Sequence, residues 1–177
     1  MKERPILFST PMVQAILEGR KTQTRRIKYK CDVGDVLWVR ETFNCLKLPI
    51  MENIEYWYKA DENLKRLNPD DKWKPSIFMP REAARIFLRV KDVREEDIRV
   101  ISDNDAKAEG AVFKSCKNCD YCDKHYAEGK DECYSYDFID VWNSLNAKRG
   151  YSWESNPFVK VIEFELIKNY GGKNGIF

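Results

Sequence analysis

An alternating stretch near the middle of the chain constrains the fold most. Ile86, Leu88 and Val90 occupy every second position, followed by Val93, so the apolar side chains share one face. Successive side chains of a strand point to opposite faces, and this spacing therefore predicts a β-strand over 86–93. Further strands are predicted at 6–8, 36–43, 56–60 and 158–167, and a loop at 61–74.

Three helices are predicted. Four apolar residues recur at i, i+3, i+4 and i+7, which predicts an amphipathic helix: Phe138, Val141, Trp142 and Leu145. Thr10 as the cap, Pro11 at the first helical position and Gly19 after the last turn bound a helix near the N-terminus. A capping pattern at Ser102 opens a short helix over 103–109. Several short strands with few helices predict an α+β domain around a small β-barrel or curled sheet.

Composition limits the possible partners. The 177 residues suit one domain, and 31 basic against 29 acidic residues leave a net charge of only +2. Any contact with nucleic acid must therefore come from a local patch. The sequence has no apolar window long enough to span a membrane and no signal peptide at its start, so we expect a cytoplasmic protein without a membrane partner.

The clearest patch is a basic run between Gly19 and Cys31. It contains no acid and six basic residues: Arg20, Lys21, Arg25, Arg26, Lys28 and Lys30. Clustered positive charge attracts phosphate and lowers the pKa of a lysine within it, and a hydroxyl beside such a lysine, here Thr22 or Thr24, can act as a nucleophile. The alternative is a solvated basic turn. An extended backbone would point Lys21 and Thr24 to opposite faces, so their cooperation requires a turn or bulge.

Arg40 and Glu41 form a second polar pair, expected near the end of the strand over 36–43. Two interpretations stay open for them. They either line a binding pocket or form a cross-strand ion pair.

Four cysteines near the second half of the chain have the spacing of metal ligands: Cys116, Cys119, Cys122 and Cys133. Closely spaced thiolates suit tetrahedral zinc, and His125 could replace one of them. An iron–sulfur cluster and free thiols are the alternatives. A closed site of four ligands has no open position for catalysis, so we expect structural zinc within a cysteine-rich insert at 114–136. The remaining cysteines, Cys31 and Cys45, are isolated and are expected to be buried or incidental.

Several of these segments together resemble the ASCH domain, a PUA-like family, in the longer form found in phages and prophages. The similar stretches are Ile6–Phe8, Ile16–Arg26, Gly34–Phe43, Ile101–Ala106, Glu109–Gly110, Phe138, Trp142, Asn146, Arg149–Gly150, Trp153, Asn156–Pro157 and Val161–Phe164. The resemblance implies a small PUA-like β-barrel with flanking helices, forming a single domain over 1–167. It excludes roughly 44–72 and 111–136, and a C-terminal tail follows at 168–177.

The family resemblance also implies a chemistry. Small bacterial ASCH proteins include an amidohydrolase that removes acetyl from N4-acetylcytidine, with a catalytic lysine and threonine in a Lys-Thr-x-Thr motif that falls on Lys21 and Thr24. Its catalytic glutamate matches Glu109, with Glu41 as the competitor. Other members are RNA binders and some are nucleases, so family membership defines the fold better than the chemistry.

Three hypotheses follow. In the first, Lys21 is the base toward the hydroxyl of Thr24, which attacks an acylated cytidine, while Glu109 handles protons. In the second, the same region binds RNA without chemistry. The residues assigned to contacts with substrate or RNA are Arg20, Thr22, Arg25, Arg26, Arg40 and Glu41. A ribonuclease is the third. No organic cofactor is expected, and the oligomeric state stays open.

Overall fold

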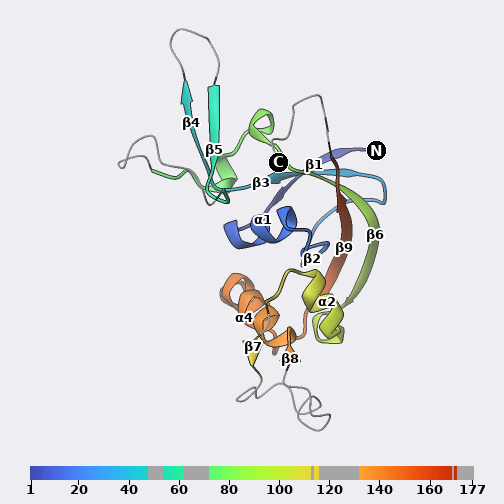
Figure 1. Ribbon diagram of the computed structural model, residues 1–177. Coiled ribbons are helices and arrows are strands. Elements are labelled where there is room, and N and C mark those ends of the chain that lie inside the picture. Colours follow the sequence, from blue (N-terminus) through green and yellow to red (C-terminus); the bar gives the residue numbers. More distant parts are fainter. Residues whose placement is uncertain (48–53, 62–71, 113, 116–131, 169, 171–177) are drawn as a thin grey trace.

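The computed structural model describes residues 1–177 except 48–53, 62–71, 113, 116–131, 169 and 171–177 (Figure 1). The strands in chain order are β1 Glu3–Leu7, β2 Gln23–Arg26, β3 Val36–Arg40, β4 Phe43–Lys47, β5 Ile54–Tyr58, β6 Phe87–Asp97, β7 Lys114–Ser115, β8 Glu132–Cys133 and β9 Phe158–Leu166. The α-helices are α1 Thr10–Leu17, α2 Asp103–Ala108 and α4 Ser135–Asn146. Short 3-10 turns are η1 Ser76–Phe78, η2 Arg81–Ala83, η3 Ile98–Val100 and η4 Ala147–Arg149.

A mixed sheet of five strands organises the molecule, in the order β1-β3-β6-β9-β2. β1 is parallel to β3, and the other neighbouring pairs are antiparallel. β6 and β9 pair from Leu88 opposite Leu166 to Asp97 opposite Phe158, with a shift of register between Val90 and Asp92. A bulge of this kind increases local twist, and Figure 1 shows both strands strongly curved.

The helix α1 lies on the concave side of this curve (Figure 1). Its buried Val13 and Ile16 pack in one apolar cluster with residues of β1, β3, β6 and β9. The predicted helix is confirmed with one correction, because Ser9 rather than Thr10 is the N-cap. Gly19 follows the helix with φ of +75°, the left-handed conformation expected of a residue that ends a helix.

A second apolar cluster joins α2 and α4 to the end of β9. The predicted helix near 138–145 is confirmed, but its buried stripe differs from the predicted one. Phe138, Ile139 and Trp142 are buried, whereas Val141 is 37% and Leu145 is 52% exposed. The helix therefore packs with a face rotated toward Ile139, and two of the four predicted core positions lie on its outer side.

The α+β class is confirmed, but a closed barrel is not seen. Within the described residues β1 and β2 are the two edges of the sheet and do not pair with each other, so the sheet is curved and open. The strand predicted over 36–43 is also two strands. β3 ends at Arg40 and pairs with β1 and β6. β4 begins at Phe43 and pairs with β5 in a separate hairpin that projects from the sheet (Figure 1).

The predicted zinc ligands Cys116, Cys119 and Cys122, together with His125, lie outside the described residues, as does the side chain of Cys133. Most of the predicted tail at 168–177 lies outside them too. In the part of the chain that the structure describes, no group of three or more histidine, cysteine or acidic side chains is placed to hold a metal ion. None of the helices found there is long and apolar enough to cross a membrane.

Candidate functional site

Backbone hydrogen bonds hold the start of the basic run between two helices. The amide of Lys21 donates to the carbonyl of Ala15 in α1 at 2.9 Å, and the amide of Thr22 donates to Ala108 in α2 at 2.9 Å. β2 then begins at Gln23 and pairs with β9. Lys21 thus precedes the strand, so the alternation of side chains along β2 does not fix the direction of its side chain.

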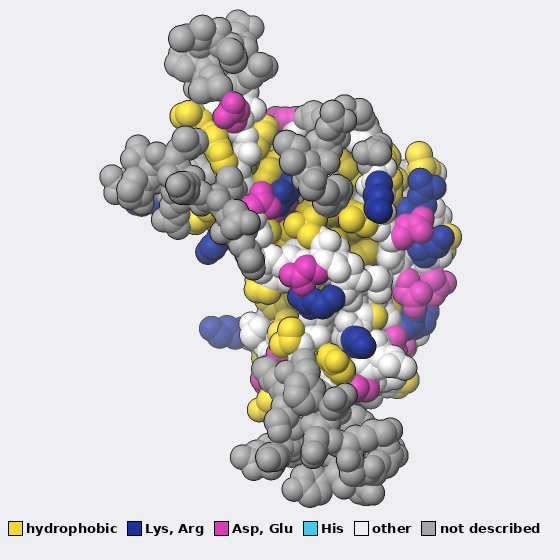
Figure 2. Space-filling model, in the orientation of Figure 1, with side chains coloured by type: hydrophobic (Ala, Val, Ile, Leu, Met, Phe, Trp, Pro, Cys, Tyr) yellow, Lys and Arg dark blue, Asp and Glu magenta, His cyan; other side chains and the backbone are white. Residues whose placement is uncertain are grey.

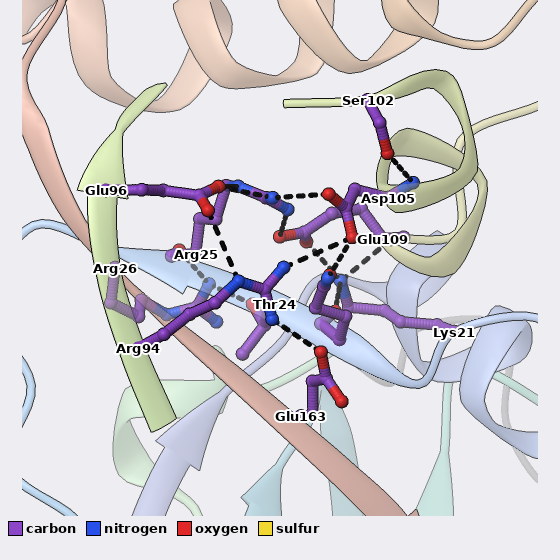
Figure 3. Close-up of polar contacts among 11 residues, drawn as sticks. Lys21, Thr24, Arg25, Arg26, Arg94, Glu96, Ser102, Asp105, Glu109 and Glu163 are labelled. Carbon is purple, nitrogen blue, oxygen red and sulfur yellow. Dashed lines mark hydrogen bonds and ion pairs between the residues drawn. The ribbon is translucent and has the colours of Figure 1, made fainter. Parts of the chain in front are cut away.

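The ammonium of Lys21 is buried and paired with Glu109. Its Nζ donates to Oε2 of Glu109 at 2.8 Å, to the carbonyl of Glu109 at 2.7 Å and to the carbonyl of Gln23 at 2.8 Å (Figure 3). All three ammonium hydrogens therefore have acceptors, and the side chains of Lys21 and Glu109 are only 0% and 7% exposed. Burial lowers the pKa of Lys21, and the carboxylate of Glu109 partly offsets this effect.

Arg25 holds the other oxygen of the same carboxylate. Its Nη1 donates to Oε1 of Glu109 at 3.2 Å, and its Nη2 lies 2.7 Å from Glu96 and 3.5 Å from Asp105. The side chain of Arg25 is fully buried, with its guanidinium 5.8 Å from the centre of the Phe138 ring. Three carboxylates thus surround this arginine, and it orients Glu109 against Lys21 (Figure 3).

Thr24 is fully buried and lies on the face of β2 opposite to Gln23 and Arg25. Its Oγ1 accepts a hydrogen bond of 2.6 Å from Nη1 of Arg26, whose Nη2 donates to the carbonyl of Leu7 at 3.0 Å. Lys21 Nζ and the Arg26 guanidinium lie 5.5 and 5.1 Å from the centre of the same Phe8 ring. The structure therefore brings Lys21, Thr24 and Glu109 into one neighbourhood. Lys21 contacts Glu109 directly and is linked to Thr24 through Arg26 and Phe8.

Two other members of the predicted set are exposed at the edge of this site. Arg20 forms an ion pair with Glu18 and donates to the carbonyl of Gly110 at 3.3 Å. Thr22 is exposed as well. These two residues do not contact the buried pair, and they belong to the outer surface of the basic run.

Arg40 and Glu41 lie in a separate place. Arg40 stacks over Trp38 at 5.6 Å and donates to the carbonyl of Ile77. Glu41 is 1% exposed and pairs with Arg85 at 2.9 Å, so the cross-strand pair between Arg40 and Glu41 is not formed. Burial raises the pKa of Glu41, and Arg85 partly offsets this shift. Of the two candidate glutamates, Glu109 contacts Lys21.

Some residues of the site were not predicted from the sequence. Gly110 has φ of +86°, and a Cβ added there would lie 3.0 Å from the Cβ of Ala15 and 3.1 Å from the Cβ of Lys21. The close approach of α2 to Lys21 therefore depends on a glycine at this position. Gln23 and Asp105 also enter the site, and the alternation of Gln23 with Arg25 within β2 was a signal for the first of them.

The outer face of the sheet is of mixed charge. Figure 2 shows basic and acidic side chains intermixed over the curved strands β6 and β9. The ion pairs there include Lys160 with Glu95 at 3.4 Å and Lys91 with Glu165 at 3.4 Å. Because opposite charges alternate, the described part of this face offers no broad basic patch for a nucleic acid.

Comparisons with known proteins give a structural likeness. The fold is similar to a high-resolution crystal structure of an ASCH domain from Lactobacillus crispatus JV V101, over 93% of this chain and 79% of that chain, with 12% identity and a TM-score of 0.44. No protein-family model matches the sequence, and no curated protein matches it significantly.

Proposed function

We propose that this chain acts on RNA or a modified nucleoside as an amidohydrolase, removing the acyl group from N4-acylated cytidine. The observation that supports this most is the buried ion pair between Lys21 and Glu109, which Arg26 and Phe8 link to the buried hydroxyl of Thr24. The Lys-Thr-x-Thr motif, similar to that of the ASCH amidohydrolase, supports these roles for Lys21 and Thr24, and the contact of Glu109 with Lys21 supports its role as the acid.

The site contains a candidate base and a candidate acid for such a reaction. A base is needed to take the proton of Thr24, and an acid is needed to protonate the leaving amine. Burial lowers the pKa of Lys21, which favours the amine form that accepts the proton of Thr24, and Glu109 lies 2.8 Å from Nζ to receive that proton. Glu109 then carries the proton that the leaving group takes.

The proposed reaction proceeds in two steps. Thr24 Oγ1 attacks the acyl carbon as Lys21 accepts its proton, the C–N bond breaks, and Glu109 protonates the cytosine amine. Water then attacks the acyl-threonine ester, which returns the hydroxyl of Thr24 and releases the acid. Arg26, which donates to Thr24 Oγ1 at 2.6 Å, is assigned to stabilise the negative charge that develops on the acyl oxygen beside it.

A second candidate function, RNA binding without chemistry, is favoured by a different observation. The basic run divides into buried and exposed cations, and Arg20, Lys28 and Lys30 are exposed. Contacts of these residues with phosphate would make affinity fall steeply as salt increases. Binding of a nucleoside without phosphates would depend on salt only weakly.

The test is hydrolysis of N4-acetylcytidine by the purified protein, followed by chromatography for cytidine. Thr24→Val and Lys21→Met are expected to lower turnover by about 100-fold or more. Thr42→Val, a threonine outside the site, is the matched control and retains turnover. Wild-type turnover in a folded Thr24→Val variant would contradict the covalent step. Absence of cytidine with wild-type protein, together with salt-dependent RNA affinity, would favour the binding function.

A further inference from the structure

Gln23 carries a buried acceptor that no other group in the described part of the chain uses. The residue is 2% exposed, and its Nε2 donates to Oδ1 of Asp105 at 2.7 Å. Its Oε1 is buried and has no hydrogen-bond partner among the described residues. A buried acceptor without a partner costs stability, so it calls for an explanation.

The orientation of this carboxamide is determined by its neighbours. Burial raises the pKa of Asp105, but Arg25, Ser102, Arg94 and Gln23 together outweigh it and lower the pKa, so this carboxylate is ionised and accepts only. A rotated carboxamide would place Oε1 against the carboxylate. Gln23 therefore directs its NH2 group to Asp105 and keeps its oxygen free.

The carboxamide lies in the same layer as the proposed catalytic pair. Gln23 stands between Lys21 and Arg25 on alternate positions, and all three contact residues of α2 or its C-terminal end. Asp105 precedes Glu109 by one helical turn. The free acceptor thus belongs to the layer between β2 and α2 that holds the carboxylate of Glu109.

We propose that Gln23 determines base specificity, with Oε1 accepting a hydrogen bond from the exocyclic N–H of the bound base. This inference rests on the proposed function, because it assumes that a nucleoside occupies this site. Cytosine and N4-acylcytosine carry an N–H at position 4, whereas uracil carries a carbonyl oxygen there. An acceptor fixed in a buried site therefore favours binding of cytosine and N4-acylcytosine and opposes binding of uracil.

The experiment measures binding of CMP and UMP to the wild type and to Gln23→Met by calorimetry. We expect the wild type to prefer CMP about tenfold, equivalent to about 1.4 kcal/mol, and the variant to lose this preference. Melting temperature should stay equal or rise, because Met removes the orphaned acceptor. The matched control is Gln14→Met, since Gln14 lies in α1, donates to the carbonyl of Ala60 away from the site and should retain the preference.

A merely structural role for Gln23 predicts the opposite result, a lower melting temperature with the CMP preference intact, and that result overturns the inference. Changing the ligand instead of the protein tests the same hydrogen bond on the wild type, even if the Gln23→Met variant does not fold. N4,N4-dimethyl-CMP has no N4–H and should bind about tenfold more weakly than CMP. Equal binding of CMP and its dimethyl derivative overturns the role of Gln23.

The outcomes separate this inference from the proposed function. Binding of CMP and UMP with equal affinity, together with hydrolysis of N4-acetylcytidine, overturns the inference alone. A CMP preference that depends on Gln23, without hydrolysis, supports the inference and overturns the proposed reaction. Binding of neither nucleotide, without hydrolysis, overturns both.

Discussion

The substitution Glu109→Gln tests whether the site depends on a buried charge pair. It keeps the size of the side chain and removes one negative charge from between Lys21 and Arg25, which lie 2.8 and 3.2 Å from the carboxylate oxygens. Arg25 retains Glu96 and Asp105 as partners. The fully buried ammonium of Lys21 keeps hydrogen-bond acceptors but loses its counter-charge.

The loss of this counter-charge determines the expected decrease in the free energy of unfolding. Removing one partner of a buried ion pair costs about 3–5 kcal/mol, a large part of the stability of an ordinary domain. Lys21→Met leaves Glu109 with Arg25 and should cost less, about 1–3 kcal/mol. The double variant leaves neither group unpaired, so its loss should be smaller than the sum of the two single losses by about 1 kcal/mol or more.

The assay is urea unfolding at pH 7, followed by tryptophan fluorescence. Trp142 and Trp153 are buried in the cluster that contains α2 and therefore report on this region. The slope of the unfolding free energy against urea should be the same for all four proteins. A loss below about 1 kcal/mol in Glu109→Gln, or additive losses in the double variant, would refute the argument from a buried charged pair.

Three further predictions concern other parts of the structure. Gly110→Ala should lower the free energy of unfolding in urea by about 2–4 kcal/mol, since the new methyl group adds a 3.0 Å contact to the strain of a positive φ. Gly34→Ala, with φ of +86° and open space around the new methyl group, should lower it by about 1–2 kcal/mol. Hydrogen bonding from its neighbours lowers the pKa of Asp35 from 3.8 to about 2, so its contribution to stability is complete above pH 3.8 and is lost as pH falls toward 2. NMR titration of its carboxyl checks this, and a pKa near 3.8 would contradict it. Arg85→Met should cost about 3–5 kcal/mol at neutral pH because it leaves Glu41 buried without its cation. This cost should shrink on acidification, because burial raises the pKa of Glu41 and its neutral form needs no partner; a cost independent of pH would count against it.

Local features of the fold could be predicted from sequence because they depend on neighbours along the chain. The end of α1 at Gly19 and the N-cap at Ser102, whose hydroxyl accepts from the amide of Asp105, are of this kind. The face of α4 was predicted in part only. The four apolar residues predicted a single stripe, whereas packing against β9 and α2 buries the adjacent face that includes Ile139.

The site was predicted less completely, because its charges are paired over long distances in sequence. A run of cations without acids suggested contacts of Arg25 with phosphate. Its actual partners Glu96 and Glu109 come from positions 71 and 84 residues further along the chain. Whether Lys21 and Thr24 cooperate also could not be judged from alternation, since Lys21 stands just before the strand and its side chain turns back to the carbonyl of Gln23.

The charge balance of the buried layer bears on which ligand the site suits. Four cations and four carboxylates lie in this layer and at its border. Lys21, Arg25 and Arg94 are ion-paired with Glu96, Asp105, Glu109 and Glu163, whereas Arg26 contacts Thr24, and the side chains of Arg94 and Glu163 are partly exposed. A neutral set of this kind exerts little net attraction on phosphate, which instead would meet the exposed Arg20, Lys28 and Lys30. The buried layer offers directed hydrogen bonds, which under the proposed function would serve an uncharged amide on a base. Under the proposed function, the buried part of the basic run would face the base and its exposed part would face the phosphate backbone.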